Sequence, residues 1–229
     1  MRFKDRFATW FLVASLAIPC LSLASGMDSL DVPPANSGVP TFKPYRRIHL
    51  GPAYENTVIE AMAYECPYCR ELNTAMFQWA RTLPKTIHFV QMPAVVGLSW
   101  VPQGQAYFAV MASDPSAIRR FDEAAFAEVQ DRHLPFSSPK TYLQAAKDAG
   151  LNLRSYYDAA MDPQVHQLVL KDIKVMAKVH VRKTPTLIIC GRYAINPGGV
   201  QGNYGVFFEL ADALVSRCLT ENRLGGGTQ

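Results

Sequence analysis

Cys66 and Cys69 enclose a Pro-Tyr dipeptide at the point where strand-forming residues give way to helical periodicity. The run before the pair, residues 57–64, is short, β-prone at its start and apolar apart from Glu60, which is typical of a strand buried on both faces. After the pair, apolar residues recur at helical spacing, namely Leu72, Met76, Trp79, Ala80 and Leu83. The pattern therefore predicts a buried strand and then a helix that begins at the cysteines.

A cysteine at a helix N-terminus has unusual chemistry, because unpaired N–H groups and partial positive charge there favour the thiolate. The position predicts that Cys66 is the attacking sulfur. Cys69 lies one turn further in and is expected to be shielded and to resolve a mixed disulfide. Pro67 suits the first helical position, where its missing N–H leaves no hydrogen bond unmade. With Tyr68 it completes the expected active-site loop.

The motif has two other interpretations, a zinc half-site and a structural disulfide. Zinc sites normally use two closely spaced pairs of Cys or His ligands, whereas Cys190 and Cys218 lie far apart with no such partner. We therefore expect no metal and no cofactor, and the motif favours redox chemistry.

The N-terminus has the order of a secretory signal peptide: basic residues, an apolar stretch over residues 7–23 and then small residues. We expect cleavage after Ala24, giving a signal peptide over 1–24. An uncleaved anchor helix, and hence a membrane-tethered form, is the alternative, since the apolar stretch is close to the lower length limit of a span. A lipid anchor on Cys20 is disfavoured by the Ile-Pro step before it.

Cleavage would remove Cys20 and leave an even number of cysteines, which in an exported chain indicates oxidising surroundings. Cys190 and Cys218 are then expected to form a second disulfide if the last helix packs back across the preceding strands. Two unpaired, buried cysteines are the alternative.

The order of elements predicts an α/β fold with an inserted helical subdomain. Residues 25–44 are rich in Pro, Ser, Gly and Asn and are expected to form a flexible arm, and 220–229 a frayed tail. Amphipathic helices are predicted throughout 99–178, between two segments of one discontinuous domain, 45–98 and 179–219. Beyond 57–64, strands are predicted over 86–92, 185–190 and 193–195, the last two joined by a turn at Gly191 and Arg192, and a closing helix over 206–219.

The chain has 229 residues and is 49% hydrophobic, enough for one elaborated domain. The formal net charge is +4, but the Lys and Arg residues are scattered and form no long run. Nucleic acid is therefore not expected as a partner.

The residues Glu65-Cys66-Pro67-Tyr68-Cys69, followed much later by Val181-Arg182-Lys183-Thr184-Pro185, resemble the DsbA family of thioredoxin-fold proteins. The similarity extends over residues 45–219 and is specific over 149–197. It implies a thioredoxin-like fold interrupted by a helical domain, and a periplasmic location in a Gram-negative bacterium. It further implies that the protein oxidises reduced or unfolded exported proteins and is itself reoxidised by an inner-membrane, quinone-linked partner of the DsbB type.

The resemblance also implies roles for individual residues. In the family, the proline that matches Pro185 is cis and packs against the two cysteines, and the residue before it pairs with the substrate chain, so Thr184 and Pro185 are expected to bind substrate. The family has a buried acid where Glu60 stands, which implies that Glu60 relays the proton of Cys69; a salt-bridged or strand-edge Glu is the alternative. The family's basic partner for this acid has no clear match, Gln91 and His88 being nearest.

Two departures from the family bear on the direction of exchange. Tyr68 stands where strong oxidants have a histidine, and Thr184 stands where valine is frequent, so the disulfide is expected to be less oxidising. The favoured hypothesis is a monomeric oxidase of exported proteins. A periplasmic reductase or isomerase, which Thr184 favours, and a non-catalytic chaperone with a structural disulfide are the rivals. An apolar groove beside the cysteines is expected at Met92, Pro93, Val95, Val96 and Trp100.

Overall fold

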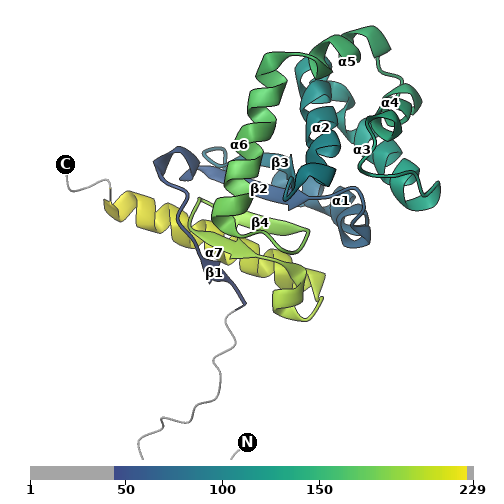
Figure 1. Ribbon diagram of the computed structural model, residues 1–229. Helices are drawn as coiled ribbons and strands as arrows, with labels where there is room; N and C mark the ends of the chain where they lie inside the picture. The colour runs from purple at the N-terminus through teal and green to yellow at the C-terminus, as the bar shows by residue number, and fades with distance from the viewer. Residues whose placement is uncertain (1–43, 226–229) are drawn as a thin grey trace, which may run out of the picture. The chain divides into compact units, whose positions relative to one another are not determined.

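The computed structural model describes residues 44–225 (Figure 1). The predicted signal peptide and nearly all of the predicted arm lie outside the described residues. Five strands form one mixed sheet in the order β1-β5-β4-β2-β3. They are β1 (Arg46–Arg47), β2 (Thr57–Met62), β3 (His88–Pro93), β4 (Thr186–Ile189) and β5 (Tyr193–Ile195).

Strand β2 lies inside the sheet, parallel to β3 and antiparallel to β4. Its side chains alternate between two cores, as a strand buried on both faces requires. Val58 packs with residues of α1 (Pro67–Ala80) and α7 (Tyr204–Gly225). Ile59 and Ala61 pack on the other face with residues of α6 (Pro163–Val179). The sheet is therefore covered on both faces (Figure 1).

Five helices lie between β3 and β4 in the chain, as predicted. They are α2 (Val101–Ser113), α3 (Ile118–Phe126), α4 (Pro139–Asp148), α5 (Leu153–Ala160) and α6. Helix α3 passes directly into a short π-helical segment, η4 (Ala127–Asp131). The core of this helical block includes Tyr64, Cys66 and Cys69, so the cysteines lie at the junction of sheet and helices. The predicted α/β layout is confirmed.

The predicted hairpin β4–β5 is present, but its turn is centred one residue earlier than expected. Arg192 N–H donates to the Ile189 carbonyl at 3.0 Å, and the central residues are Cys190 (φ 51°) and Gly191 (φ 62°). Positive φ at both central positions is the type I′ geometry that matches the twist of a tight hairpin.

Helix α7 continues through Gly225, so the tail expected from residue 220 is wrong over its first half. Two hydrogen bonds connect this extension of α7 to β5 and to the loop before β2. Glu221 accepts a hydrogen bond from the Tyr193 hydroxyl at 2.8 Å, and the Asn222 amide donates to the Glu55 carbonyl at 3.2 Å. Within residues 44–225, no helix has both the length and the apolar character needed to cross a bilayer.

Candidate redox site

Cys66 occupies the N-cap of α1 in extended conformation, with Pro67 at the first position of the helix. The Cys66 sulfur accepts a hydrogen bond from the Cys69 backbone N–H at 3.3 Å. A serine or aspartate side chain usually accepts this capping hydrogen bond, whereas here the acceptor is a sulfur atom. The first turn of the helix thus directs its unpaired N–H groups at Cys66.

The two cysteines carry free thiols and differ sharply in acidity. A hydrogen bond with the Cys69 side chain is the main cause that lowers the pKa of Cys66, to about 6. Backbone N–H groups of the helix also lower this pKa, whereas burial opposes the change. Burial, followed by the nearby Cys66, raises the pKa of Cys69, which is only 1% exposed. One thiol is therefore ready to ionise near neutral pH while the other holds its proton.

The Thr184–Pro185 step faces these sulfurs from a distant part of the sequence. The Cys66 thiol donates to the Thr184 carbonyl, with 3.1 Å between Sγ and O, across 118 residues of chain. The Thr184–Pro185 peptide bond is cis. Helix α6 ends at Val179, and His180 after it has a left-handed conformation (φ 52°) that stops the helix four residues before Thr184.

Glu60 is fully buried on β2, and Gln91 lies beside it in register on β3. The Gln91 amide donates to Glu60 Oε2 at 3.1 Å, and Glu60 Oε1 has no hydrogen-bond partner among the described residues. Burial raises the pKa of Glu60 to about 8, with the Gln91 hydrogen bond opposing and the charges of Asp122 and Cys66 adding. Gln91 and His88 stand nearest to the position of the basic residue that pairs with this acid in the family, and of the two only Gln91 contacts Glu60. His88 is exposed and pairs with Thr57.

Three residues of the helical block that the sequence did not single out hold the segment leading to Cys66. Gln103 Oε1 accepts from the Tyr64 N–H at 3.2 Å, and Asp122 accepts from the Tyr64 hydroxyl at 2.7 Å. The Gln130 amide donates to the carbonyls of Tyr64 (2.8 Å) and Cys66 (3.1 Å). The sequence does contain one indication of Asp122. This residue stands among the apolar positions of its helix, where a carboxylate is unusual.

Comparisons with known proteins agree with this geometry. The family model described as Thioredoxin matches residues 47–201. The thiol:disulfide interchange protein DsbA of Pseudomonas aeruginosa is 22% identical over 160 residues, 70% of this chain and 74% of the relative. That of Pseudomonas syringae pv. tomato is 23% identical over 206 residues, 90% of this chain and 94% of the relative. The crystal structure of Pseudomonas aeruginosa DsbA matches with a TM-score of 0.69 at 21% identity, covering 79% of this chain and 95% of that one.

This chain belongs to the DsbA family of the thioredoxin superfamily. The resemblance stated from the motifs is thereby confirmed, and so is the thioredoxin-like fold with additional helices. By this distant homology the protein is a DsbA-like thiol-disulfide oxidoreductase.

A groove beside the cis proline is the surface that this DsbA-family member presents next to Cys66. We call it the cis-proline groove; its volume is about 500 Å³ and its lining includes Tyr68, Lys183, Thr184, Pro185, Pro197 and Tyr204. Tyr68 is 58% exposed, so its ring is available to a bound chain. The groove is therefore open to an extended peptide that passes Thr184.

The apolar groove predicted at residues 92–100 is present in part: Val95 and Val96 line a hollow of about 570 Å³ with residues of α6, although Thr184 is not in its lining. Met92, Pro93 and Val95 are buried in the protein, because β3 and the residues after it pack under the helices. Val96 and Trp100 do line a small pocket of about 150 Å³ together with Thr184 and Glu65. The Trp100 indole N–H donates to the Glu65 carboxylate there.

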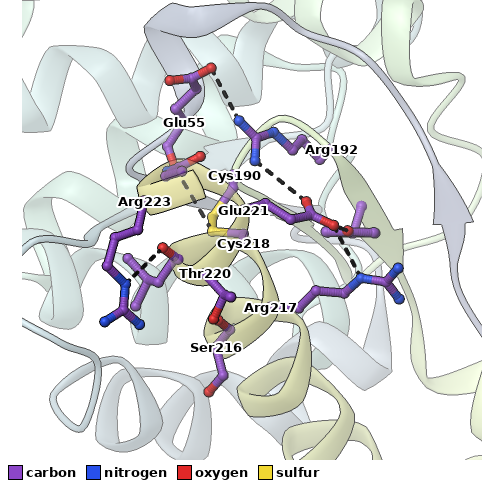
Figure 2. Close-up of polar contacts among 12 residues, drawn as sticks. Glu55, Cys190, Arg192, Ser216, Arg217, Cys218, Thr220, Glu221 and Arg223 are labelled. Carbon is purple, nitrogen blue, oxygen red and sulfur yellow. Dashed lines mark hydrogen bonds and ion pairs between the residues drawn. A yellow bond between two sulfur atoms is a disulfide. The ribbon is translucent and has the colours of Figure 1, made fainter. Parts of the chain in front are cut away.

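Cys190 and Cys218 form a disulfide in the structure, with 6.4 Å between their Cα atoms (Figure 2). It joins the turn of the β4–β5 hairpin to α7, and both residues are buried. Around it, Arg192 forms ion pairs with Glu55 (3.2 Å) and Glu221 (3.4 Å), and Arg217 pairs with Glu221 (3.2 Å). These residues lie on the hairpin, on α7 and in the loop before β2, and none of them lines the cis-proline groove.

Proposed function

We propose that this protein introduces disulfides into exported proteins by exchange at Cys66 and Cys69. The observation that carries the proposal is the asymmetry of the pair: an N-cap thiol with a pKa lowered to about 6 beside a buried thiol with a raised pKa. A stabilised Cys66 thiolate favours the reduced form of the pair, and this makes the corresponding disulfide a better oxidant.

The exchange has two steps in which atoms and electrons balance. A substrate thiolate attacks Cys66 Sγ, the Cys66–Cys69 bond breaks, and Cys69 leaves with the electron pair and takes up a proton. The second substrate thiolate then attacks the substrate sulfur of the mixed disulfide and releases Cys66 as a thiolate. The substrate loses two electrons and gains a disulfide, and the enzyme is left as a dithiol.

The surrounding residues support particular roles in these steps. The low pKa of Cys66 makes it a good leaving group in the second step. Glu60, whose raised pKa of about 8 lets it hold a proton near neutral pH, supplies and accepts the proton of Cys69. Thr184 and Pro185 bind the substrate backbone next to Cys66.

The cellular setting belongs to the same proposal. Cleavage of a signal peptide over residues 1–24 would release a monomer into the periplasm, where a DsbB-type membrane partner would reoxidise it. N-terminal sequencing of the protein recovered from the periplasmic fraction tests this setting. An N-terminus at Met1 in the membrane fraction would instead support the tethered form.

A second candidate function uses the same cysteines in the reducing direction. Two features favour it: Thr184 precedes the cis proline, and Tyr68 carries a neutral phenol where an imidazolium would stabilise the thiolate. The pKa of Cys66 is then lowered by hydrogen bonds with Cys69, Thr184 and backbone N–H groups, with burial opposing them. A membrane electron donor would keep such a reductase or isomerase in its dithiol form.

Equilibration of the mature protein with glutathione redox buffers separates these functions. The fraction of reduced Cys66 and Cys69 is measured by alkylation and mass, with a Cys66→Ala variant as control. We expect a potential clearly above that of the glutathione pool. A strongly reducing potential would support the reductase, and a pair that never exchanges would support a structural disulfide in a chaperone.

A further inference from the structure

A pocket lined by cations adjoins the cis-proline groove and is not used by the exchange chemistry. We call it the basic pocket; its volume is about 610 Å³, and its lining includes Arg46, His180, Arg182, Lys183, Asn196 and Gly198. Lys183 and Gly198 line the cis-proline groove as well. The two hollows therefore adjoin at Lys183 and Gly198, next to Thr184.

The charges of the basic pocket are all of one sign. Its lining has two arginines, one lysine and one histidine and no carboxylate. Within residues 44–225, none of these four side chains forms an ion pair with an acidic residue. The Arg46 guanidinium donates to the Val179 carbonyl at 3.1 Å, which fixes its position at the pocket.

Two carboxylates line or flank neighbouring hollows, and each accepts a hydrogen bond from another group. Glu65 lines the small pocket beside Thr184, which Arg182 and Lys183 also line, and accepts a hydrogen bond from the Trp100 indole. Glu71 accepts from the Tyr204 hydroxyl at 2.9 Å, at the α7 side of the cis-proline groove. Neither carboxylate lines the basic pocket, so its cations are left to attract an anionic group from outside.

Lys183 and Arg182 directly precede Thr184, the residue that a substrate backbone would meet. An extended chain advances about 3.3 Å per residue, so side chains within about three residues of the reacting cysteine come within reach of Lys183. Complementary charge at such a distance raises the association rate and selects partners by sign.

We propose that the basic pocket selects substrates with aspartate or glutamate within about three residues of the reacting cysteine. This inference rests on the proposed exchange at Cys66 and names its substrate class: acidic cysteine segments. Lys183 and Arg182 bind the acidic side chain while Thr184 binds the backbone beside it.

The test uses two dithiol peptides that differ only in two residues flanking the first cysteine, Asp in one and Asn in the other. Their kcat/KM values for oxidation by the mature, oxidised protein are compared at low salt. Each kcat/KM value is first divided by the rate at which the same peptide reacts with a small neutral disulfide. This step is needed because acidic neighbours also change the reactivity of the peptide thiol. We expect the Asp peptide to be favoured about three- to tenfold, and the preference to shrink in about 0.5 M salt.

Charge reversal provides the matched comparison. In Lys183→Glu the Asp/Asn ratio should fall to one or below. Lys147→Glu changes the net charge equally on α4, away from the pocket, and should keep the wild-type ratio. Equal ratios in the wild type and Lys183→Glu, with both peptides oxidised, would overturn the inference and leave the exchange function standing.

Loss of the exchange function itself gives a different result, in which the wild type oxidises neither peptide. Fluorescence anisotropy of the labelled peptides with Cys66→Ser protein then tests the pocket alone. Tighter binding of the Asp peptide, lost in the Lys183→Glu background, supports the pocket, whereas equal binding of both peptides rejects it.

Discussion

At the scale of single residues, the site depends on where charge is placed around two sulfurs. Cys66 receives N–H groups and a hydrogen bond that stabilise its thiolate, whereas Cys69 lies in the core near a carboxylate. That carboxylate, Glu60, has an amide partner in Gln91 and forms no ion pair with any residue of 44–225. Its proton is therefore held near neutral pH, which suits a group that exchanges protons with Cys69.

Replacing Glu60 with Gln should lower the pKa of Cys69. Burial and Cys66 are the larger causes of its raised pKa, but the Glu60 charge adds to them. In a Cys66→Ser background, which removes the neighbouring thiolate, we expect Glu60→Gln to lower the pKa of Cys69. The ultraviolet absorbance of the thiolate against pH measures this change. An unchanged midpoint would show that Glu60 does not act on Cys69.

At the scale of elements, the disulfide between Cys190 and Cys218 fastens the last helix to the sheet. The bond spans 28 residues and joins a tight hairpin turn to α7. The ion pairs of Arg192 and Arg217 with Glu221 flank it (Figure 2), but they are partly exposed and contribute little by comparison. The cross-link is therefore the main local constraint on this end of the helix.

Replacing both Cys190 and Cys218 with Ala should lower the free energy of unfolding by about 2 to 4 kcal/mol, because the unfolded chain is no longer closed into a loop. Urea denaturation of the oxidised protein measures the loss. The redox potential of Cys66 and Cys69 should stay the same, since neither replaced residue lines the cis-proline groove. Thr220→Ala, an exposed change on the same helix, is the control and should cost less than about 0.5 kcal/mol.

At the scale of the whole molecule, three buried carboxyl groups link stability to pH. Burial raises the pKa values of Glu60, Asp122 and Asp172 to about 8 each. In the unfolded chain these groups titrate near their ordinary values, 4.5 for Glu and 3.8 for Asp. Between these limits the folded state binds more protons than the unfolded state, so the free energy of unfolding falls as pH rises. The contribution of these three groups to stability should be greatest in mild acid and should be lost as pH rises through about 8.

Replacing Asp172 tests one of these groups by itself, because neither of its carboxyl oxygens has a hydrogen-bond partner in the part of the chain that the structure describes. Asp172→Asn should reduce the loss of stability between about pH 4 and pH 8 by roughly 1 to 3 kcal/mol. Chemical denaturation at a series of pH values measures the slope. Asp158→Asn, at an exposed ion pair with Arg154, should leave it unchanged. A wild-type stability that rises over this range would contradict the assignment.

The sequence by itself determined the local parts of this protein. Hydrophobic period, proline position and the order of strands and helices depend on neighbouring residues, so they predicted the strand at Glu60, the helix opening at Cys66 and the β4–β5 hairpin. The importance of Thr184 came from the family resemblance, since no local pattern distinguishes that step from any other Thr-Pro.

Only the tertiary structure decided which distant groups meet. The contact between Cys66 and Thr184, and the hold of Asp122 and Gln130 on the segment before Cys66, join parts of the chain that no periodicity connects. The end of α7 was set in the same way, by partners on the hairpin and in the loop before β2. A buried polar group must find its partner wherever packing places one, and packing is a property of the whole chain.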